Sequence, residues 1–278
     1  MSKYGYVKRN RMRIFLGRQY YTMKRYCNWM FGGIKFAKRR QQETDFQYVY
    51  FKHSTPLLRK LQGVDMQLQY NKVSNLKIAA AKINQIVINP GETFSYWKLI
   101  GKPTRWKGYK EGLVLFCGTY KQGVGGGLCQ LSNLIYWMAL HTPLTVIERY
   151  RHSYDVFPDS NRKLPFGSGA TCVYNYKDLM IKNETSTPFQ INVWLTKDSL
   201  CGNFKANVVP LESYHVYEKN HYMAKEMFGG YSRNNEIYRA VYNMDGEQIA
   251  DEYVTENHAL MMYEPMIEEK EERKELLK

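Results

Sequence analysis

Apolar residues recur with a helical period in the middle of the chain, directly after a run of three glycines. The apolar positions fall at i, i+3, i+4 and i+7, which places them on one face of a helix that begins at Cys129. These positions are Leu131, Leu134, Ile135 and Met138. A second helix is predicted over residues 74–86, with Ser74 as its N-cap, and a short one over residues 56–61.

Elsewhere apolar and polar residues alternate with a period of two residues, which is typical of strands. Residues 189–195 alternate cleanly, and residues 237–242 and 248–254 flank Asp245-Gly246, a dipeptide that favours a hairpin turn. Further strands are predicted over 92–97, 113–117, 144–148, 170–174 and 178–181. A few helices followed by many adjacent strands predict an α+β fold with a largely antiparallel sheet and a central helix starting at Cys129.

Positive charge is concentrated at one end of the chain. The first 62 residues hold 15 Lys or Arg and only two acids, Glu43 and Asp45, so nearly all of the net charge of +14 belongs there. We therefore predict a basic, aromatic N-terminal arm over residues 1–45, a main domain over 46–260 and a charged C-terminal tail over 261–278. The alternative for the arm is a solvated, partly helical extension.

Aromatic residues interleaved with Lys and Arg in the arm suit an amphipathic helix at an anionic membrane surface, or docking to a protein partner. They also suit single-stranded nucleic acid, but no RNP-type or helix-turn-helix motif accompanies them, so we rank nucleic acid below the other two. No apolar run approaches the roughly 18 residues of a membrane span. We expect a cytoplasmic protein that the arm can hold at the inner membrane face.

Five cysteines are present, and none forms a CxxC pair. An odd number without that spacing argues against a zinc site and against a complete disulfide framework. The histidines show no metal-ligand spacing either. We therefore predict neither a metal nor a cofactor.

Cys129 is the residue whose position most favours chemistry. It follows Gly125-Gly126-Gly127 and opens a helix, where the helix dipole favours a thiolate. His152 follows on the far side of a predicted strand and could act as its base. Backbone N–H groups near Gly127 could hold an oxyanion. The structural alternatives are a small buried side chain at a tight helix–sheet contact for Cys129, and a hydrogen-bonded structural histidine for His152.

Several motifs follow one another in a distinctive order. They are Asn89-Pro90-Gly91-Glu92-Thr93-Phe94-Ser95, Gly108-Tyr109, Gly125-Gly126-Gly127-Leu128-Cys129-Gln130-Leu131-Ser132, Glu148-Arg149 with His152-Ser153, and Asp178-Leu179 with Asn183. In order and spacing, over roughly residues 56–200, the chain resembles the VanW family, in the short form found with B-type vancomycin resistance clusters. The resemblance implies an accessory protein associated with glycopeptide resistance or with the bacterial cell envelope, and it implies no particular reaction.

Two hypotheses follow. In the first, the protein is a cysteine-dependent acyl transferase or amidase, with Cys129 as nucleophile, His152 as base, and Asp178 or Asp155 orienting the imidazole. Many relatives carry an aspartate where this chain has Gly169, so Asp178 is our choice for the acid. The residues predicted to contact substrate, a cell-wall precursor or a peptide, are Gly126, Gly127, Gln130 and Arg149. The alternatives are a turn carboxylate for Asp178 and a solvated face for Arg149 and Arg151.

In the second hypothesis the protein is a non-enzymatic scaffold. Its basic arm docks on an anionic membrane or a partner protein, and the main domain recognises a peptide or cell-wall precursor.

Overall fold

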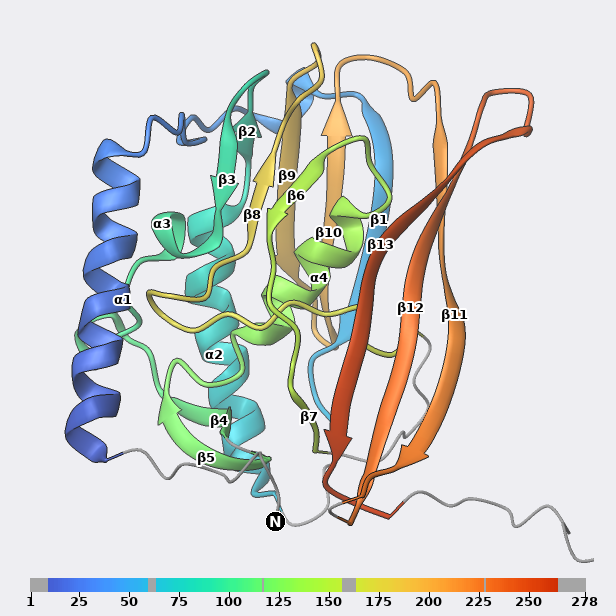
Figure 1. Cartoon of the computed structure of the whole chain (residues 1–278). Coiled ribbons are helices and arrows are strands. Elements are labelled where there is room, and N and C mark those ends of the chain that lie inside the picture. The colour runs from blue at the N-terminus through green and yellow to red at the C-terminus, as the bar shows by residue number, and fades with distance from the viewer. Residues whose placement is uncertain (1–9, 60–63, 117, 157–163, 228, 265–278) are drawn as a thin grey trace, which may run out of the picture.

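A four-stranded antiparallel sheet forms one layer of the fold, and two helices pack against it (Figure 1). Its strand order is β1–β10–β9–β2, with β1 (Tyr48–Pro56), β10 (Ser199–Ala206), β9 (Phe189–Leu195) and β2 (Ile86–Ile88). The helices are α2 (Met66–Ile83) and α4 (Cys129–Ala139). This computed structural model describes residues 10–59, 64–116, 118–156, 164–227 and 229–264.

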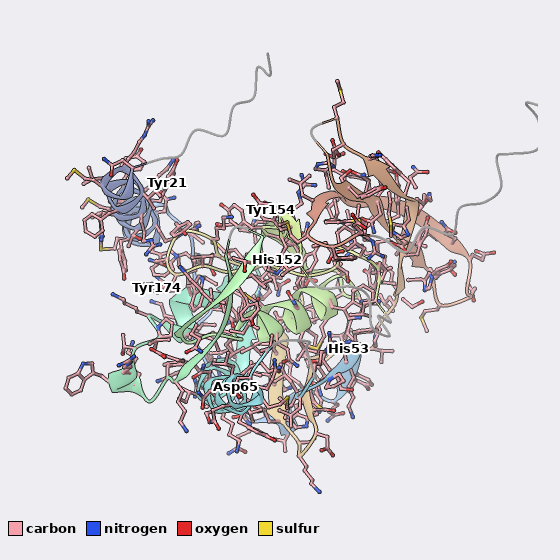
Figure 2. The ribbon with its side chains drawn as sticks, turned by 90° about the horizontal axis from the view of Figure 1, so that it is seen from below. Tyr21, His53, Asp65, His152, Tyr154 and Tyr174 are labelled. Carbon is pink, nitrogen blue, oxygen red and sulfur yellow. The ribbon has the colours of Figure 1, made fainter. Side chains whose placement is uncertain are left out.

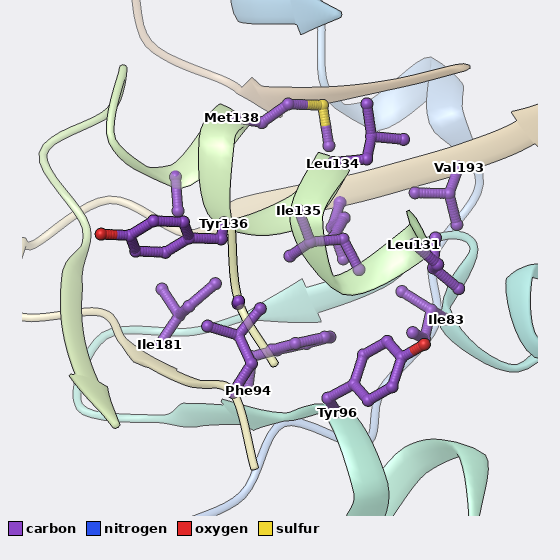
Figure 3. Close-up of a cluster of buried hydrophobic side chains, with 14 of the residues drawn as sticks. Ile83, Phe94, Tyr96, Leu131, Leu134, Ile135, Tyr136, Met138, Ile181 and Val193 are labelled. Atoms are coloured by element: carbon purple, nitrogen blue, oxygen red, sulfur yellow. The ribbon is translucent and has the colours of Figure 1, made fainter. Parts of the chain in front are cut away.

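A three-stranded sheet closes the other side of α4, so this helix lies at the centre of the fold. The sheet has the order β3–β8–β6 and consists of β3 (Thr93–Ser95), β8 (Met180–Lys182) and β6 (Thr145–Glu148). Figure 3 shows Phe94 and Ile181 from this sheet below Ile135 of α4, with Val193 of β9 on the opposite side. All four side chains are at most 2% exposed, so the α4 helix is packed on both faces.

A long antiparallel meander packs beside this core and is paired with a short strand. Its order is β11–β12–β13–β7, with β11 (Ser213–Lys225), β12 (Tyr231–Tyr242), β13 (Gln248–Met261) and β7 (Tyr154–Asp155). The Asp245-Gly246 turn joins β12 to β13 as predicted, with Gly246 at a φ of 81°. Among the described strands, only β13 and β7 pair in parallel. The predicted α+β class with largely antiparallel sheets is therefore confirmed.

The remaining elements lie at the edges of this core. A two-stranded hairpin packs near α2, a short helix follows β3, and a long helix runs along one side of the molecule (Figure 1). These elements are β4 (Glu111–Phe116), β5 (Thr119–Val124), α3 (Tyr96–Ile100) and α1 (Arg11–Phe31), together with the 3-10 turns Glu43–Asp45 and Arg105–Lys107.

The central helix begins at Cys129 as predicted, but other local predictions were wrong. The α2 helix begins at Met66 because Asp65, not Ser74, caps it by accepting a hydrogen bond from the Gln67 N–H at 2.8 Å. Residues 57–59 are not helical, because the chain up to Pro56 pairs with β10 as an edge strand. The strand predicted over 92–97 ends at Ser95, whose Oγ accepts a hydrogen bond from the Lys98 N–H and starts α3.

The predicted domain limits at residues 45 and 260 stay predictions. Within the arm, the residues after α1 run along the core: Phe36 bridges to Thr93, Arg40 bridges to Ile86, and Ala37 is 2% exposed. Most of the charged tail, from residue 265 on, lies outside the described residues.

Candidate functional site

Close packing explains the three glycines before α4: Gly126 meets another backbone, and Gly125 and Gly127 meet the side chains of Pro103 and Lys72. A Cβ on Gly126 would lie 2.2 Å from the carbonyl carbon of Gly112 in β4, so two backbones touch at this point. The buried side chain of Asn75 on α2 donates to the Gly126 carbonyl at 2.9 Å. The Gly127 N–H donates to the carbonyl of Leu113 at 3.0 Å. This amide is therefore engaged within the fold and does not face an open oxyanion site.

Cys129 occupies the first position of α4, as predicted, but its surroundings do not favour a thiolate. The Sγ atom lies 3.8 Å from the carbonyl oxygen of Cys172, to which the thiol donates. Burial raises the pKa of the Cys129 thiol, and this effect exceeds the lowering by backbone hydrogen bonds. The neighbouring Tyr96 hydroxyl donates to the Leu128 carbonyl at 2.8 Å. Cys129 thus sits as a protonated thiol in a packed helix start.

His152 lies in the segment between β6 and β7 and is neutral at physiological pH. Burial, followed by the positive charges of Arg149 and Lys177, lowers its pKa to about 4. Figure 2 shows His152 within the outline of the molecule, close to Tyr154. In the part of the chain that the structure describes, the His152 ring makes no hydrogen bond to Cys129 or Asp178.

Asp178 is fully buried and holds the start of α3. Its carboxylate accepts hydrogen bonds from the Ser95 hydroxyl at 2.5 Å, the Trp97 N–H at 2.9 Å and its neighbour Leu179 N–H at 2.9 Å. Burial raises its pKa to about 6 despite these donors. The three donors occupy both carboxylate oxygens, so the side chain acts as a cap for α3.

The alternative acid, Asp155, belongs to a different cluster. Its carboxylate accepts a hydrogen bond from the Tyr263 hydroxyl at 2.7 Å and lies 3.6 Å from the Arg233 guanidinium, and both partners of this ion pair are buried. The structure therefore places Asp155 and Asp178 in separate hydrogen-bond networks.

Gln130 and Arg149, predicted to bind substrate, are also engaged within the fold. The Gln130 amide donates to the Thr55 hydroxyl and to the Pro56 carbonyl, each at 2.9 Å, and so joins α4 to the end of β1. The Arg149 guanidinium donates to the carbonyls of Gly167 and Gly169 and stacks 5.0 Å from the centre of the Tyr136 ring. The assignment of substrate contacts to these residues stays a prediction.

Side-chain contacts that were not predicted from the sequence join the N-terminal arm to this region. The Arg25 guanidinium on α1 forms an ion pair with both carboxylate oxygens of Glu148 on β6. The Tyr26 hydroxyl lies 2.5 Å from the Tyr174 hydroxyl, and Lys98 lies over the Trp29 ring. Arg25 and Trp29 are four residues apart on one helix face, which is the only sequence signal that could have indicated the contact.

No group of three or more His, Cys, Asp or Glu side chains is arranged to hold a metal ion among the residues that the structure describes. The described helices include none with the length and apolarity needed to span a bilayer. The absence of a metal or cofactor stays a prediction.

Comparisons with known proteins agree with the motifs quoted above. A family model described as "VanW like protein" matches residues 71–205. The chain is 36% identical to the Vancomycin B-type resistance protein VanW of Enterococcus faecalis over 206 residues, 74% of each protein. It is 32% identical to the uncharacterized protein YoaR of Bacillus subtilis over 117 residues, 42% of this chain and 37% of that protein. No solved structure matches. This chain belongs to the VanW family.

Proposed function

We propose that this protein is an accessory protein of the bacterial cell envelope that acts in glycopeptide resistance as a binding scaffold, held at an anionic membrane surface by α1. The first part of the proposal rests on the relative from Enterococcus faecalis, whose name assigns it to B-type vancomycin resistance. The second part is carried by one observation: the apolar side of α1 is exposed.

The α1 helix presents a stripe of large apolar side chains to solvent. Four of them share one face because they are spaced by four, seven and seven residues. These are Met12, Leu16, Met23 and Met30, with exposed fractions of 68, 58, 67 and 66%. Figure 2 shows α1 almost end-on at the edge of the molecule, with its side chains spreading away from the body. A stripe of this kind marks a surface that is covered by another apolar medium.

The positive charges on α1 favour an anionic bilayer as the apolar medium that covers this stripe. Arg13 and Lys24 are exposed on the helix and do not share the face of Arg25, and residues 11–31 include no Asp or Glu. A basic helix with an apolar stripe lies in the plane of an anionic bilayer, with the apolar side chains between the headgroups and the cations against lipid phosphates. Each cation near such a surface contributes about 1 kcal/mol.

The contacts of α1 with the body use a different face, so both can form at once. Arg25 and Trp29 point toward β6 and α3, whereas the methionines and Leu16 do not share that face. The ion pair of Arg25 with Glu148 would then transmit the orientation of the bound helix to the domain.

A cysteine-dependent activity has less support. Cys129 is at a helix start, but the raised pKa of its thiol and the hydrogen bond from this thiol to the Cys172 carbonyl disfavour nucleophilic attack. Cys129→Ser separates the two functions: it should abolish a resistance phenotype that depends on the thiol and should leave a scaffold unaffected.

Vesicle co-sedimentation of the full chain tests the membrane proposal. Vesicles of phosphatidylcholine with a quarter of phosphatidylglycerol should bind the protein, and binding should weaken as salt is raised. Arg13→Gln and Lys24→Gln combined should reduce partitioning by about thirtyfold. Leu16→Ser with Met23→Ser should also reduce it.

The matched control is Leu211→Ser with Met244→Ser, which removes two apolar side chains that are similarly exposed elsewhere. This variant should bind like the unmodified chain. Equal binding of the α1 variants and the control, or no salt dependence, would contradict docking through α1.

A further inference from the structure

An open depression of about 400 Å³ lies between the segment that follows β6 and the strand β13. Its walls come from three parts of the chain: the Arg149–Ser153 segment, Lys177 just before β8, and Thr255 with Glu256 on β13. In Figure 1 this segment descends from β6 to β7, which pairs with β13. The walls of the depression are thus held together by the pairing of β7 with β13.

Three cations line this depression, against one carboxylate. Arg149, Arg151 and Lys177 contribute the positive charges, and Glu256, on an exposed position of β13, contributes the negative one. Among the described residues, none of the three cations forms an ion pair with an Asp or Glu. Arg25 and Arg239, by contrast, each pair with a glutamate. The depression therefore carries excess positive charge.

Arg149 is a largely buried cation without a carboxylate partner in the described part of the chain. Its guanidinium is largely buried, and all its hydrogen-bond partners are neutral: the carbonyls of Gly167 and Gly169, the Thr255 hydroxyl and the Asn257 amide oxygen. Burial lowers its pKa, and the charge of Arg151 adds to this lowering, against an opposing effect of Tyr136. A buried cation without a counter-ion is costly, and the arrival of an anion lowers that cost.

The neighbouring His152 is subject to the same positive charges. After burial, the charges of Arg149 and Lys177 are the causes of its lowered pKa. A hydroxyl donor is also at hand, because Ser153 is exposed in the lining.

We propose that this depression is a binding site for an oxyanion, a carboxylate or phosphate group carried by a small ligand, with Arg151 and Lys177 as the groups that contact it and Arg149 as the fixed charge beneath it. Arg151 uses one guanidinium nitrogen to donate to the Glu256 carbonyl at 3.1 Å, which orients the side chain and leaves its other N–H groups for the ligand. The volume exceeds that of a single ion and leaves room for the group that carries it. This site does not depend on the proposed membrane docking of α1.

Histidine NMR of the full chain tests the proposal, with inorganic phosphate and N-acetylalanine as separate probes. Either probe should shift the His152 resonance in a saturable manner and raise its pKa above about 4, since the bound anion offsets the charges of Arg149 and Lys177 while the effect of burial remains. Saturation by phosphate alone assigns the ligand to phosphate esters, and saturation by N-acetylalanine alone assigns it to carboxylates. Both results support an oxyanion site.

Arg151→Gln with Lys177→Gln should weaken this binding at least tenfold. Arg149 is left in place because its contacts hold the 167–169 turn. The matched control is Lys77→Gln with Lys82→Gln, which removes the same charge from exposed positions of α2. No saturable shift with either probe, or equal binding by the two double variants, would overturn the proposal. Vesicle binding by α1 is measured separately, so its failure would not affect this result.

Discussion

The Arg25 guanidinium on α1 and the Glu148 carboxylate on β6 form a two-pronged ion pair that joins positions 123 residues apart. One oxygen of the same carboxylate also accepts the Asp178 N–H at 3.1 Å. Glu148 therefore connects the N-terminal helix with the buried carboxylate that holds α3. The basic arm is attached to the core through this network.

Breaking this pair should destabilise the protein more than breaking an exposed one. The two side chains are 10% and 20% exposed, so Arg25→Ala leaves a partly buried carboxylate without its cation and should cost about 3 kcal/mol of unfolding free energy. Urea denaturation measures this value. Arg105→Ala is the control, because its pair with Glu111 is 74% and 43% exposed and should contribute less than about 1 kcal/mol. Equal losses in the two variants would show that the α1 contact contributes no more than a surface pair.

The glycine run should be sensitive for a steric reason. Gly126→Ala would place a Cβ 2.2 Å from the Gly112 backbone, which cannot rotate away as a side chain would, and should cost about 3 kcal/mol. Gly17→Ala is the control: its Cβ meets no atom within 4 Å, and alanine within the α1 helix should stabilise by about 0.5–1 kcal/mol. Thermal unfolding of both variants checks the difference. Unchanged stability of Gly126→Ala would leave the run of glycines without a packing explanation.

Local patterns in the sequence were sufficient to predict the central helix and the long hairpin. The apolar face of α4 repeats with a helical period, and Gly246 supplies the positive φ at the β12–β13 turn. The start of α2 was mispredicted because Asp65 and Ser74 are both good caps, and only the burial of Leu68 in the first turn decides between them. Such a choice depends on tertiary packing, which a local pattern does not contain.

The candidate site was harder to predict because its chemistry depends on burial and on distant partners. The position of Cys129 at a helix start was predicted correctly. The Cys172 carbonyl that accepts a hydrogen bond from its thiol, however, is 43 residues away in the sequence. Asp178 likewise has a residue type suited to catalysis, and the donors that occupy it come from the start of α3. Residue identity indicates what a side chain can do, and its neighbours in space determine its pKa and partners.

The thiols should differ in their rates of alkylation. Cys27 is exposed on α1, whereas Cys172 is buried and burial raises the pKa of both Cys129 and Cys172. Since the thiolate is the reactive form, Cys27 should react with iodoacetamide at least tenfold faster than the other two at pH 8. Peptide mass spectrometry of timed samples separates the sites, and denatured protein serves as the control, in which the difference should vanish. Fastest labelling at Cys129 would instead favour the nucleophile hypothesis.

The buried His141 should make the folded state sensitive to acid. Its ring stacks on Phe51 at 3.8 Å between centres, and its Nδ1 atom lies 2.9 Å from the Trp137 carbonyl oxygen, to which a neutral ring can donate. Burial lowers its pKa to about 4. The unfolded chain therefore takes up a proton near the usual pKa of about 6.5, before the folded protein does, and stability falls as pH drops from about 6.5 to 4.

From pH 7 to 4.5 the loss attributable to His141 should be about 2 kcal/mol, and His141→Gln should remove that part of the slope. Asp178 acts in the opposite sense, because its pKa is raised to about 6 and protonation stabilises the folded state as pH falls. His152 adds to the loss in the same window as His141. Asp178 and His152 are present both in His141→Gln and in the unmodified chain. The difference between the urea-denaturation profiles of these two proteins therefore isolates the contribution of His141. Parallel profiles between pH 7 and 4.5 would show that His141 takes up its proton equally readily in the folded and unfolded states. Between pH 7 and 9, where His141 does not titrate, the profiles should run parallel in any case.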